Sequence, residues 1–107
     1  MFVDVGFSNY VSVEKIITIS RPDSAPIKRM MDEAKNNNRF INLTQGKKTR
    51  SIIVSSKDNN IVVIGAAVQP STIVSRIRKI EEEKLARNAS ELIENSGLEV
   101  IAEGSSE

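Results

Sequence analysis

Residues 40–56 read FINLTQGKKTRSIIVSS, in which a glycine-centred turn (44–50) separates two apolar runs. Gly46 can take a positive φ at no steric cost, so it suits the centre of a tight turn. We expect the two flanking runs to be strands. The turn between them carries three cations on a rigid edge, where they can bind an anion: Lys47, Lys48 and Arg50.

The rest of the chain predicts a single α+β domain with the element order β-β-α-β-β-β-α. Alternating or β-branched apolar runs bounded by glycine, proline and asparagine indicate the strands. Because the last three strands are joined by connections too short for crossovers, we predict a small antiparallel sheet. Gly65 is a candidate bulge in the last strand. The predicted strands cover residues 2–6, 10–20 (one bent strand or two short ones), 40–43, 51–56 and 61–68.

One short helix is predicted between the second and third strand regions. It begins near Asp23 or Ser24, which can cap it, and it carries Pro26 in its first turn. Three asparagines (36–38) end it, since asparagine accepts the left-handed conformation better than most residues. The i, i+3, i+4, i+7 spacing of a core-facing stripe is formed by Ile27, Met30, Met31 and Ala34.

One long C-terminal helix is predicted from about Ser71 to Asn95, opened by Pro70. The half beyond Leu85 is longer than one small sheet can cover, so we expect it to bury its stripe against another subunit or to fray. We assign residues 1–96 to a single α+β domain and 97–107 to an acidic tail expected to be disordered. The helix stripe slips in phase once after Ile80 and comprises Ile73, Ile77, Ile80, Leu85, Ala89 and Leu92.

The composition excludes several kinds of chemistry. Cysteine and histidine are both absent, which removes disulfides, thiolate nucleophiles, Cys/His zinc sites and the commonest general base. The carboxylates at 32–33 and 81–83 lie on solvated helix faces without a nucleophile or a ligand set. The turn is not a P-loop, because a strand follows it in place of the helix that binds the nucleotide. We therefore expect no enzyme activity, no catalytic residue, no metal and no cofactor.

Charge is distributed unevenly along the chain, although its net value is only +1. Residues 15–50 hold nine cations against three anions, whereas residues 81–107 hold two cations against eight anions. This asymmetry suggests an anion-binding half and an acidic tail, with chance and solubility as the alternative explanation. Lys15, in the middle of a β-branched run, is either a solvated edge residue or a phosphate contact.

Two further features bear on partners and location. Aromatic residues are scarce, which argues against recognition of single strands by stacking. The chain starts at Met1 without a basic-then-apolar leader, and no apolar run approaches about 18 residues. We expect a cytoplasmic protein that has neither a membrane nor a small-molecule substrate among its partners.

Three motifs make the chain resemble the RemA family, small bacterial regulators of extracellular-matrix (biofilm) genes. They are residues 24–29 (SAPIKR), 44–50 (TQGKKTR) and 67–70 (AVQP), supported by residues 4–11 (DVGFSNYV). The resemblance runs from about residue 2 to residue 77. It implies a DNA-binding protein that assembles into a ring-shaped homo-oligomer, with DNA contacting or wrapping around the basic outer surface.

The resemblance also implies which residues contact DNA. In the family, DNA is bound by arginines in the glycine turn and by one arginine in the second strand region, at positions matching Lys47, Lys48 and Lys15 here. Lysine keeps the charge but lacks the planar guanidinium fork. The lysines therefore favour contact with the DNA backbone over discrimination between bases. Arg50 matches an arginine of the family motif. With Gly46, these four residues are the expected DNA-binding set.

The leading hypothesis is therefore a nucleoid-associated transcriptional regulator whose partners are double-stranded DNA and further copies of itself. An alternative is a self-assembling scaffold or protein-interaction module without direct DNA readout, in which the long helix and the acidic tail are the working parts. RNA binding is a third hypothesis, since a basic patch alone does not distinguish types of duplex.

Overall fold

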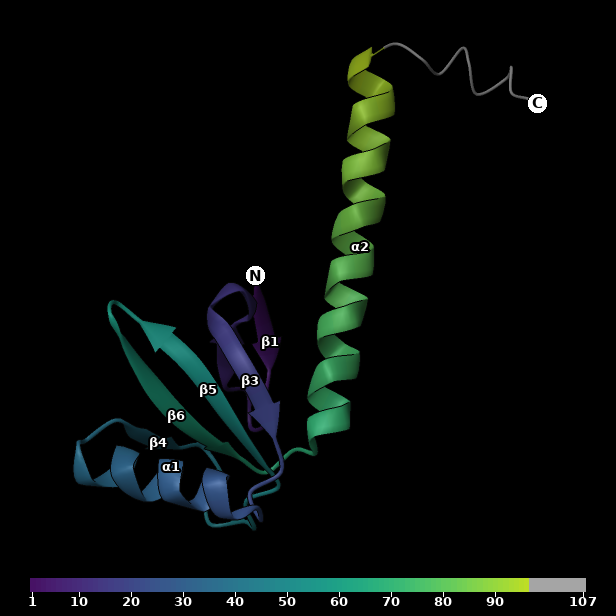
Figure 1. Cartoon of the computed structure of the whole chain (residues 1–107). Coiled ribbons are helices and arrows are strands. Elements are labelled where there is room, and N and C mark those ends of the chain that lie inside the picture. The colour runs from purple at the N-terminus through teal and green to yellow at the C-terminus, as the bar shows by residue number, and fades with distance from the viewer. Residues whose placement is uncertain (97–107) are drawn as a thin grey trace. The chain divides into compact units, whose positions relative to one another are not determined.

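The computed structural model describes residues 1–96 of the chain (Figure 1). It divides the chain into two compact units, the first covering residues 1–77 and the second beginning at Arg78. The predicted acidic tail, residues 97–107, lies outside the described residues. The prediction that residues 1–96 form one domain stays a prediction.

The element order confirms the α+β class, with one short and one long helix. The run 10–20 forms two short strands separated by a 3-10 turn, the second of the two options considered. The elements are β1 (Phe2–Asp4), β2 (Tyr10–Ser12), the 3-10 turn η1 (Val13–Lys15), β3 (Ile16–Ser20), α1 (Ala25–Asn36), β4 (Phe40–Asn42), β5 (Ser51–Lys57), β6 (Asn60–Ala66) and α2 (Pro70–Ser96).

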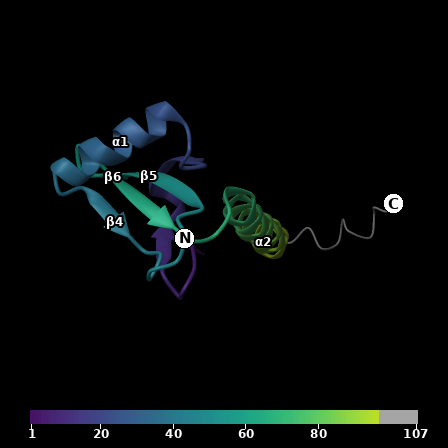
Figure 2. The ribbon, with the colours of Figure 1, turned by 90° about the horizontal axis from the view of Figure 1, so that it is seen from below.

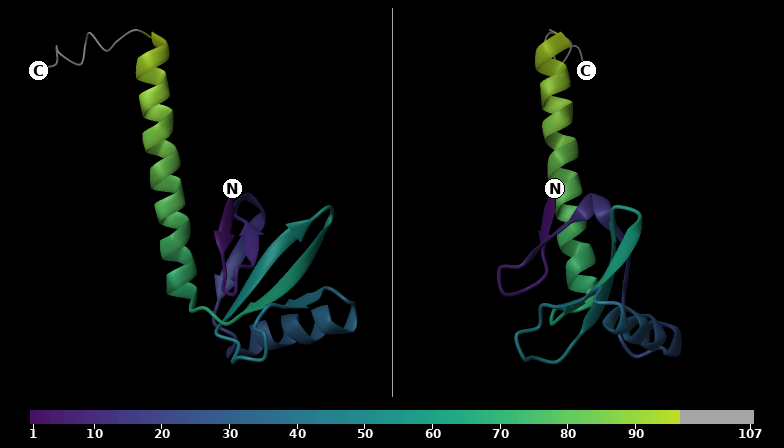
Figure 3. Two further views of the ribbon diagram at one scale, coloured as in Figure 1. Left: turned by 180° about the vertical axis from the view of Figure 1, so that it is seen from behind. Right: turned by 90° about the vertical axis from the view of Figure 1, so that its left-hand side faces the viewer.

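The strands form a two-stranded hairpin, β1–β2, and a four-stranded sheet of order β3-β5-β6-β4. Antiparallel pairing is confirmed for β5 with β6 and is also found for β3 with β5. It is wrong for β4, which pairs in parallel with β6, so the sheet is mixed. A short connection usually joins neighbouring strands, but the loop after β4 passes the end of β6 to reach β5 (Figure 3).

Two main-chain hydrogen bonds hold that loop across the end of β6. The amide of Leu43 donates to the carbonyl of Gly65 at 2.9 Å, and the amide of Arg50 donates to the carbonyl of Ala66 at 2.8 Å. Neighbouring strands are about 4.8 Å apart, so stepping over one strand spans only about 10 Å. A loop of this length covers that span easily, which is why the connection need not be a hairpin.

The core between α1 and the sheet is built as the sequence spacing predicts (Figure 2). Ser24 caps the helix, its Oγ accepting a hydrogen bond from the Ile27 amide at 3.4 Å, and Pro26 lies in the first turn. The predicted stripe faces the sheet. The cluster comprises buried Ala34, Ile52 and Val63, with Ile27, Met30, Met31 and Phe40 packed around them.

Gly65 does not form the bulge that the sequence suggested. It lies in regular register between Ile52 of β5 and Asn42 of β4. A Cβ atom at this position would lie 3.1 Å from Cζ of Phe40, tighter than ordinary van der Waals contact. The glycine is therefore explained by the Phe40 ring, which needs the space above the strand.

The first turns of α2 are fixed within the first unit, where Ile73 is fully buried. The Ser51 hydroxyl donates to the Val68 carbonyl at 2.8 Å, and Nη1 of Arg76 donates to the Asp4 carbonyl at 2.9 Å. In the second unit the helix continues to Ser96, and Leu85 and Leu92 are 71% and 70% exposed. Among the described residues, no helix is both long enough and apolar enough to cross a membrane.

We predict that Ile52→Ala lowers the free energy of unfolding by about 2–5 kcal/mol, because it leaves a cavity beneath α1. Ile17→Ala is the matched control, since Ile17 is 58% exposed at the irregularity in β3, and it should change stability by no more than about 0.5 kcal/mol. Urea unfolding followed by circular dichroism measures both. Equal losses would contradict the placement of Ile52 in the core.

Candidate nucleic-acid interface

The basic turn has the backbone that the glycine predicts. The Lys47 amide donates to the Thr44 carbonyl at 3.0 Å, and the two residues between them, Gln45 and Gly46, have φ values of 50° and 82°. Positive φ at both central positions is the pattern of a type I′ turn. A Cβ atom at Gly46 would meet nothing within 4 Å, so the glycine is required by its φ and not by a close neighbour.

The base of the turn is anchored by a buried threonine. Thr44 is only 2% exposed, and both its amide and its hydroxyl donate to Oδ1 of Asn42, at 3.0 and 2.7 Å. Together with the two main-chain bonds to β6, these contacts hold both ends of the loop. Holding binding groups in place before the partner arrives reduces the ordering cost of association.

The three cations of the turn are exposed and have no carboxylate partner within residues 1–96. Lys47, Lys48 and Arg50 all lie on the surface. Within residues 1–96, neither ion pair of the structure involves them. Their positive charge is therefore available to an external anion.

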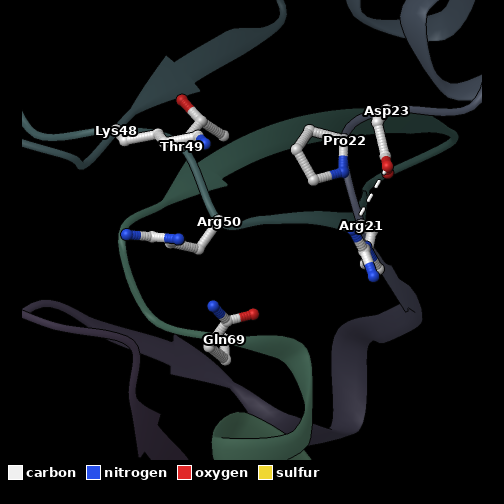
Figure 4. Close-up of a pocket in the computed structure, with 7 residues that line it drawn as sticks. All are labelled: Arg21, Pro22, Asp23, Lys48, Thr49, Arg50 and Gln69. Carbon is white, nitrogen blue, oxygen red and sulfur yellow. Dashed lines mark hydrogen bonds and ion pairs between the residues drawn. The ribbon is translucent and has the colours of Figure 1, made fainter.

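A cleft beside the turn brings in residues that the sequence reasoning missed (Figure 4). Its volume is about 210 Å³, and Arg21 and Gln69 join Lys48 and Arg50 in its lining. Ser20 pairs with Ile52 in the β3–β5 register, which sets the next residue, Arg21, near the start of β5 and so near Arg50. Only the strand register places Arg21 beside Arg50, and the sequence alone does not give that register. The full lining is Arg21, Pro22, Asp23, Lys48, Thr49, Arg50 and Gln69.

Lys15 does not join this cluster within one chain. It ends η1, and its carbonyl accepts a hydrogen bond from the Ser55 hydroxyl at 3.3 Å. Ser55 is five residues along the chain from Arg50, which corresponds to roughly 17 Å of extended strand. Lys15 and the turn therefore lie at opposite ends of β5.

The carboxylate next to Lys15 in the sequence is paired elsewhere. Both oxygens of Glu14 accept hydrogen bonds from the N-terminal ammonium of Met1, at 2.8 and 2.9 Å. This contact, with smaller help from the residue's own backbone, holds the pKa of Glu14 below its ordinary value of 4.5. Within the described residues, Lys15 consequently has no carboxylate partner of its own.

Residues 2–77 match the family model described as RemA-like, extracellular matrix regulatory protein A-like. This chain belongs to the RemA-like family. The match ends at Ile77, which is also where the first compact unit ends. The turn, the cleft and Lys15 all lie inside the family region.

Bacterial relatives cover most of this RemA-like chain. A "putative regulatory protein" of Bacillus cereus is 55% identical over 95 residues, which make up 89% of each chain. Proteins of the same description from Shouchella clausii and Thermodesulfovibrio yellowstonii are each 45% identical over 80 residues, 75% of this chain and 88% and 91% of the relatives. These names describe regulators and state no enzymatic activity.

Sequence similarity to a relative extends beyond the family region. Because the match to the Bacillus cereus protein covers 95 residues and the first unit has 77, at least 18 matched residues lie past Ile77. Part of the sequence that forms distal α2 here is therefore matched in that relative.

We predict that Gly46→Val lowers the free energy of unfolding by about 1–2 kcal/mol, since a β-branched residue resists the left-handed conformation. Gly46→Asn is the control, because asparagine tolerates that conformation, and it should cost clearly less. Thermal unfolding of both variants measures the difference. Equal stability of the two variants would show that the positive φ of this position is not essential to the folded turn.

Proposed function

We propose that this RemA-like chain is a DNA-binding transcriptional regulator that contacts the DNA backbone through its basic glycine turn and controls extracellular-matrix genes. The observation that carries the proposal is the turn itself. Three exposed cations that have no carboxylate partner among the described residues lie on a loop whose two ends are hydrogen-bonded to β6: Lys47, Lys48 and Arg50. Cations of this kind bind nucleic acid by displacing counterions from phosphates.

Backbone contact is favoured over base readout by the residue types. An ammonium group is a compact point charge, whereas a guanidinium can bind two acceptors on a base edge in a fixed plane. Two of the three cations in the turn are lysines, and only Arg50 offers the planar fork. The proposed complex is therefore strongly salt-dependent and only weakly selective for base sequence.

A ring-shaped homo-oligomer is part of the proposal because one chain offers few contacts. The turn and Lys15 together supply four cations at two separate places. Repeating them around a ring links many weak contacts, so that the overall affinity exceeds that of any single chain. The resemblance to the RemA family implies this arrangement, and the need for multivalency supports it.

A second candidate function is a self-assembling scaffold or protein-interaction module, and the distal part of α2 favours it. Leu85 and Leu92 are mostly exposed there, and apolar side chains at this spacing are typical of helix–helix contacts. Leu85 follows Ile80 by five residues, which places it about 140° round the helix from the stripe that begins at buried Ile73. Leu85 and Leu92 therefore lie on a different face of the helix from Ile73.

For about six phosphate contacts, we predict that the affinity for a duplex of mixed sequence falls roughly 10³-fold between 50 and 200 mM salt. Lys47→Ala with Lys48→Ala should weaken binding and flatten this salt dependence while leaving the oligomer intact. The control is Arg39→Ala with Lys57→Ala. It removes two exposed cations at the ends of β4 and β5 that lie away from the turn, since Arg39 precedes β4 and Lys57 is the last residue of β5.

Fluorescence anisotropy with DNA and RNA duplexes, together with native mass spectrometry, measures these quantities. Affinity that does not change with salt would contradict backbone contact. Equal weakening by the two double variants would show that net charge matters and that the turn has no special role. Tighter binding of the RNA duplex would turn the proposal toward RNA.

We further predict that Leu85→Gln with Leu92→Gln leaves both subunit count and DNA affinity unchanged, because the family region ends at Ile77. Glu83→Gln with Ser90→Gln, about 140–160° round the helix from Leu85, is the control. Native mass spectrometry with and without the duplex reports both quantities. A fall in subunit count in the leucine variant alone would favour the scaffold function.

A further inference from the structure

We propose that Arg21 and Arg50 form a clamp for one phosphate group of the DNA backbone, and that Asp23 occupies part of this clamp as a competing anion when DNA is absent. The proposal rests on the DNA-binding function above and assigns it a further binding residue, Arg21, outside the glycine turn. The site is the cleft of about 210 Å³ beside the turn (Figure 4).

Donor groups reach this cleft from three segments whose main chains are fixed. The main chain of Arg50 is held by the hydrogen bond that its amide donates to the Ala66 carbonyl. Arg21 comes directly after Ser20, which pairs with Ile52 of β5. The Gln69 carbonyl, at the start of α2, accepts hydrogen bonds from the amides of Thr72 and Ile73 at 3.1 and 3.2 Å. Figure 4 shows Arg21 and Arg50 on opposite sides of the cleft, with the Arg50 side chain directed away from Arg21 and Gln69 lying between the two. Such a frame can surround an anion without rearranging its backbone.

The charge and size of the cleft select the ligand class. The lining contains three cations, Arg21, Lys48 and Arg50, and one carboxylate, Asp23, so it carries two excess positive charges. The volume is smaller than the roughly 300–1,000 Å³ of pockets that enclose a whole small molecule. It therefore suits one charged group that belongs to a larger ligand, and guanidinium forks match the geometry of phosphate.

Asp23 already uses part of the clamp. Its Oδ2 accepts a hydrogen bond from Nη2 of Arg21 at 3.2 Å, and both side chains are exposed, at 62% and 76%. Arg21 makes no other hydrogen bond in the part of the chain that the structure describes. Its remaining donors are thus open to a phosphate, which must compete with Asp23 for the one donor in use.

The test measures binding of a mixed-sequence DNA duplex to the full chain by anisotropy at several salt concentrations. Arg21→Gln should weaken binding about tenfold and lower the salt slope by about 1 per lost phosphate contact. Arg39→Gln removes the same charge next to the far end of β4 and is the matched control. Both side chains are exposed, so thermal unfolding should be unchanged in both variants.

The converse variant tests the competing carboxylate. Asp23→Asn should tighten binding about twofold to fivefold, the range that corresponds to loss of an exposed ion pair. Asp32→Asn, an equal change of charge on α1, should tighten it less. If Asp23 acts through Arg21, Asp23→Asn should have no effect in a chain that already carries Arg21→Gln, which is a double-mutant cycle.

The outcomes separate the clamp from the DNA-binding function as a whole. If the wild-type chain binds no duplex, the proposed function fails, and the clamp fails with it. If the chain binds and Lys47→Ala with Lys48→Ala weakens binding, but Arg21→Gln behaves like Arg39→Gln, the clamp alone is overturned. Inorganic phosphate that raises the melting temperature in an Arg21-dependent way, without an Arg21 effect on duplex affinity, would also overturn it in favour of a free-anion site.

Discussion

The geometry of the candidate interface depends on two hydrogen bonds at the end of β6. The amides of Leu43 and Arg50 donate to the consecutive carbonyls of Gly65 and Ala66, so the loop between them lies across the end of the strand. Because both are hydrogen bonds between main-chain groups, their geometry is set by the sheet and not by the loop's own side chains. The loop's cations are thereby held beside β5 and β6, the two strands with the longest buried runs.

The same crossing explains why the cleft exists. With β6 between β4 and β5, the loop ends at the start of β5, the strand that also pairs with β3. The chain leaving β3 therefore passes beside Arg50, and the chain leaving β6 adds Gln69 from a third direction. A hairpin between β4 and β5 would place different neighbours beside the turn. The strand order thus decides which charged residues meet, although these residues are far apart in the sequence.

Much of this fold could be predicted from local patterns, because the patterns report local physics. The α1 stripe, the cap at Ser24 and the positive φ of Gly46 each depend on residues close in sequence, and each is confirmed. The parallel pairing of β4 could not be derived in this way, since a short loop is compatible with both a neighbouring strand and the next strand but one.

The candidate site shows the same division between local and distant information. The glycine turn was found by its composition, whereas Arg21 was counted only as one charge among many. Its position depends on a pairing between strands separated by about thirty residues, and no spacing rule contains that pairing. The bulge predicted at Gly65 is wrong for a similar reason, because the Phe40 ring that requires a glycine there comes from β4, more than twenty residues earlier in the chain.

One consequence concerns how such an interface can change during evolution. Lys47 and Lys48 make no side-chain hydrogen bond or ion pair within the described part of the chain, and the turn is anchored by Thr44, Asn42 and main-chain groups. Their replacement by other cations consequently carries little structural penalty. In the proposed symmetric assembly each substitution is repeated in every subunit, so a small gain in affinity per subunit is multiplied over all the contacts. Single substitutions in the turn could therefore change the affinity for a polyanion during evolution while the fold stays constant.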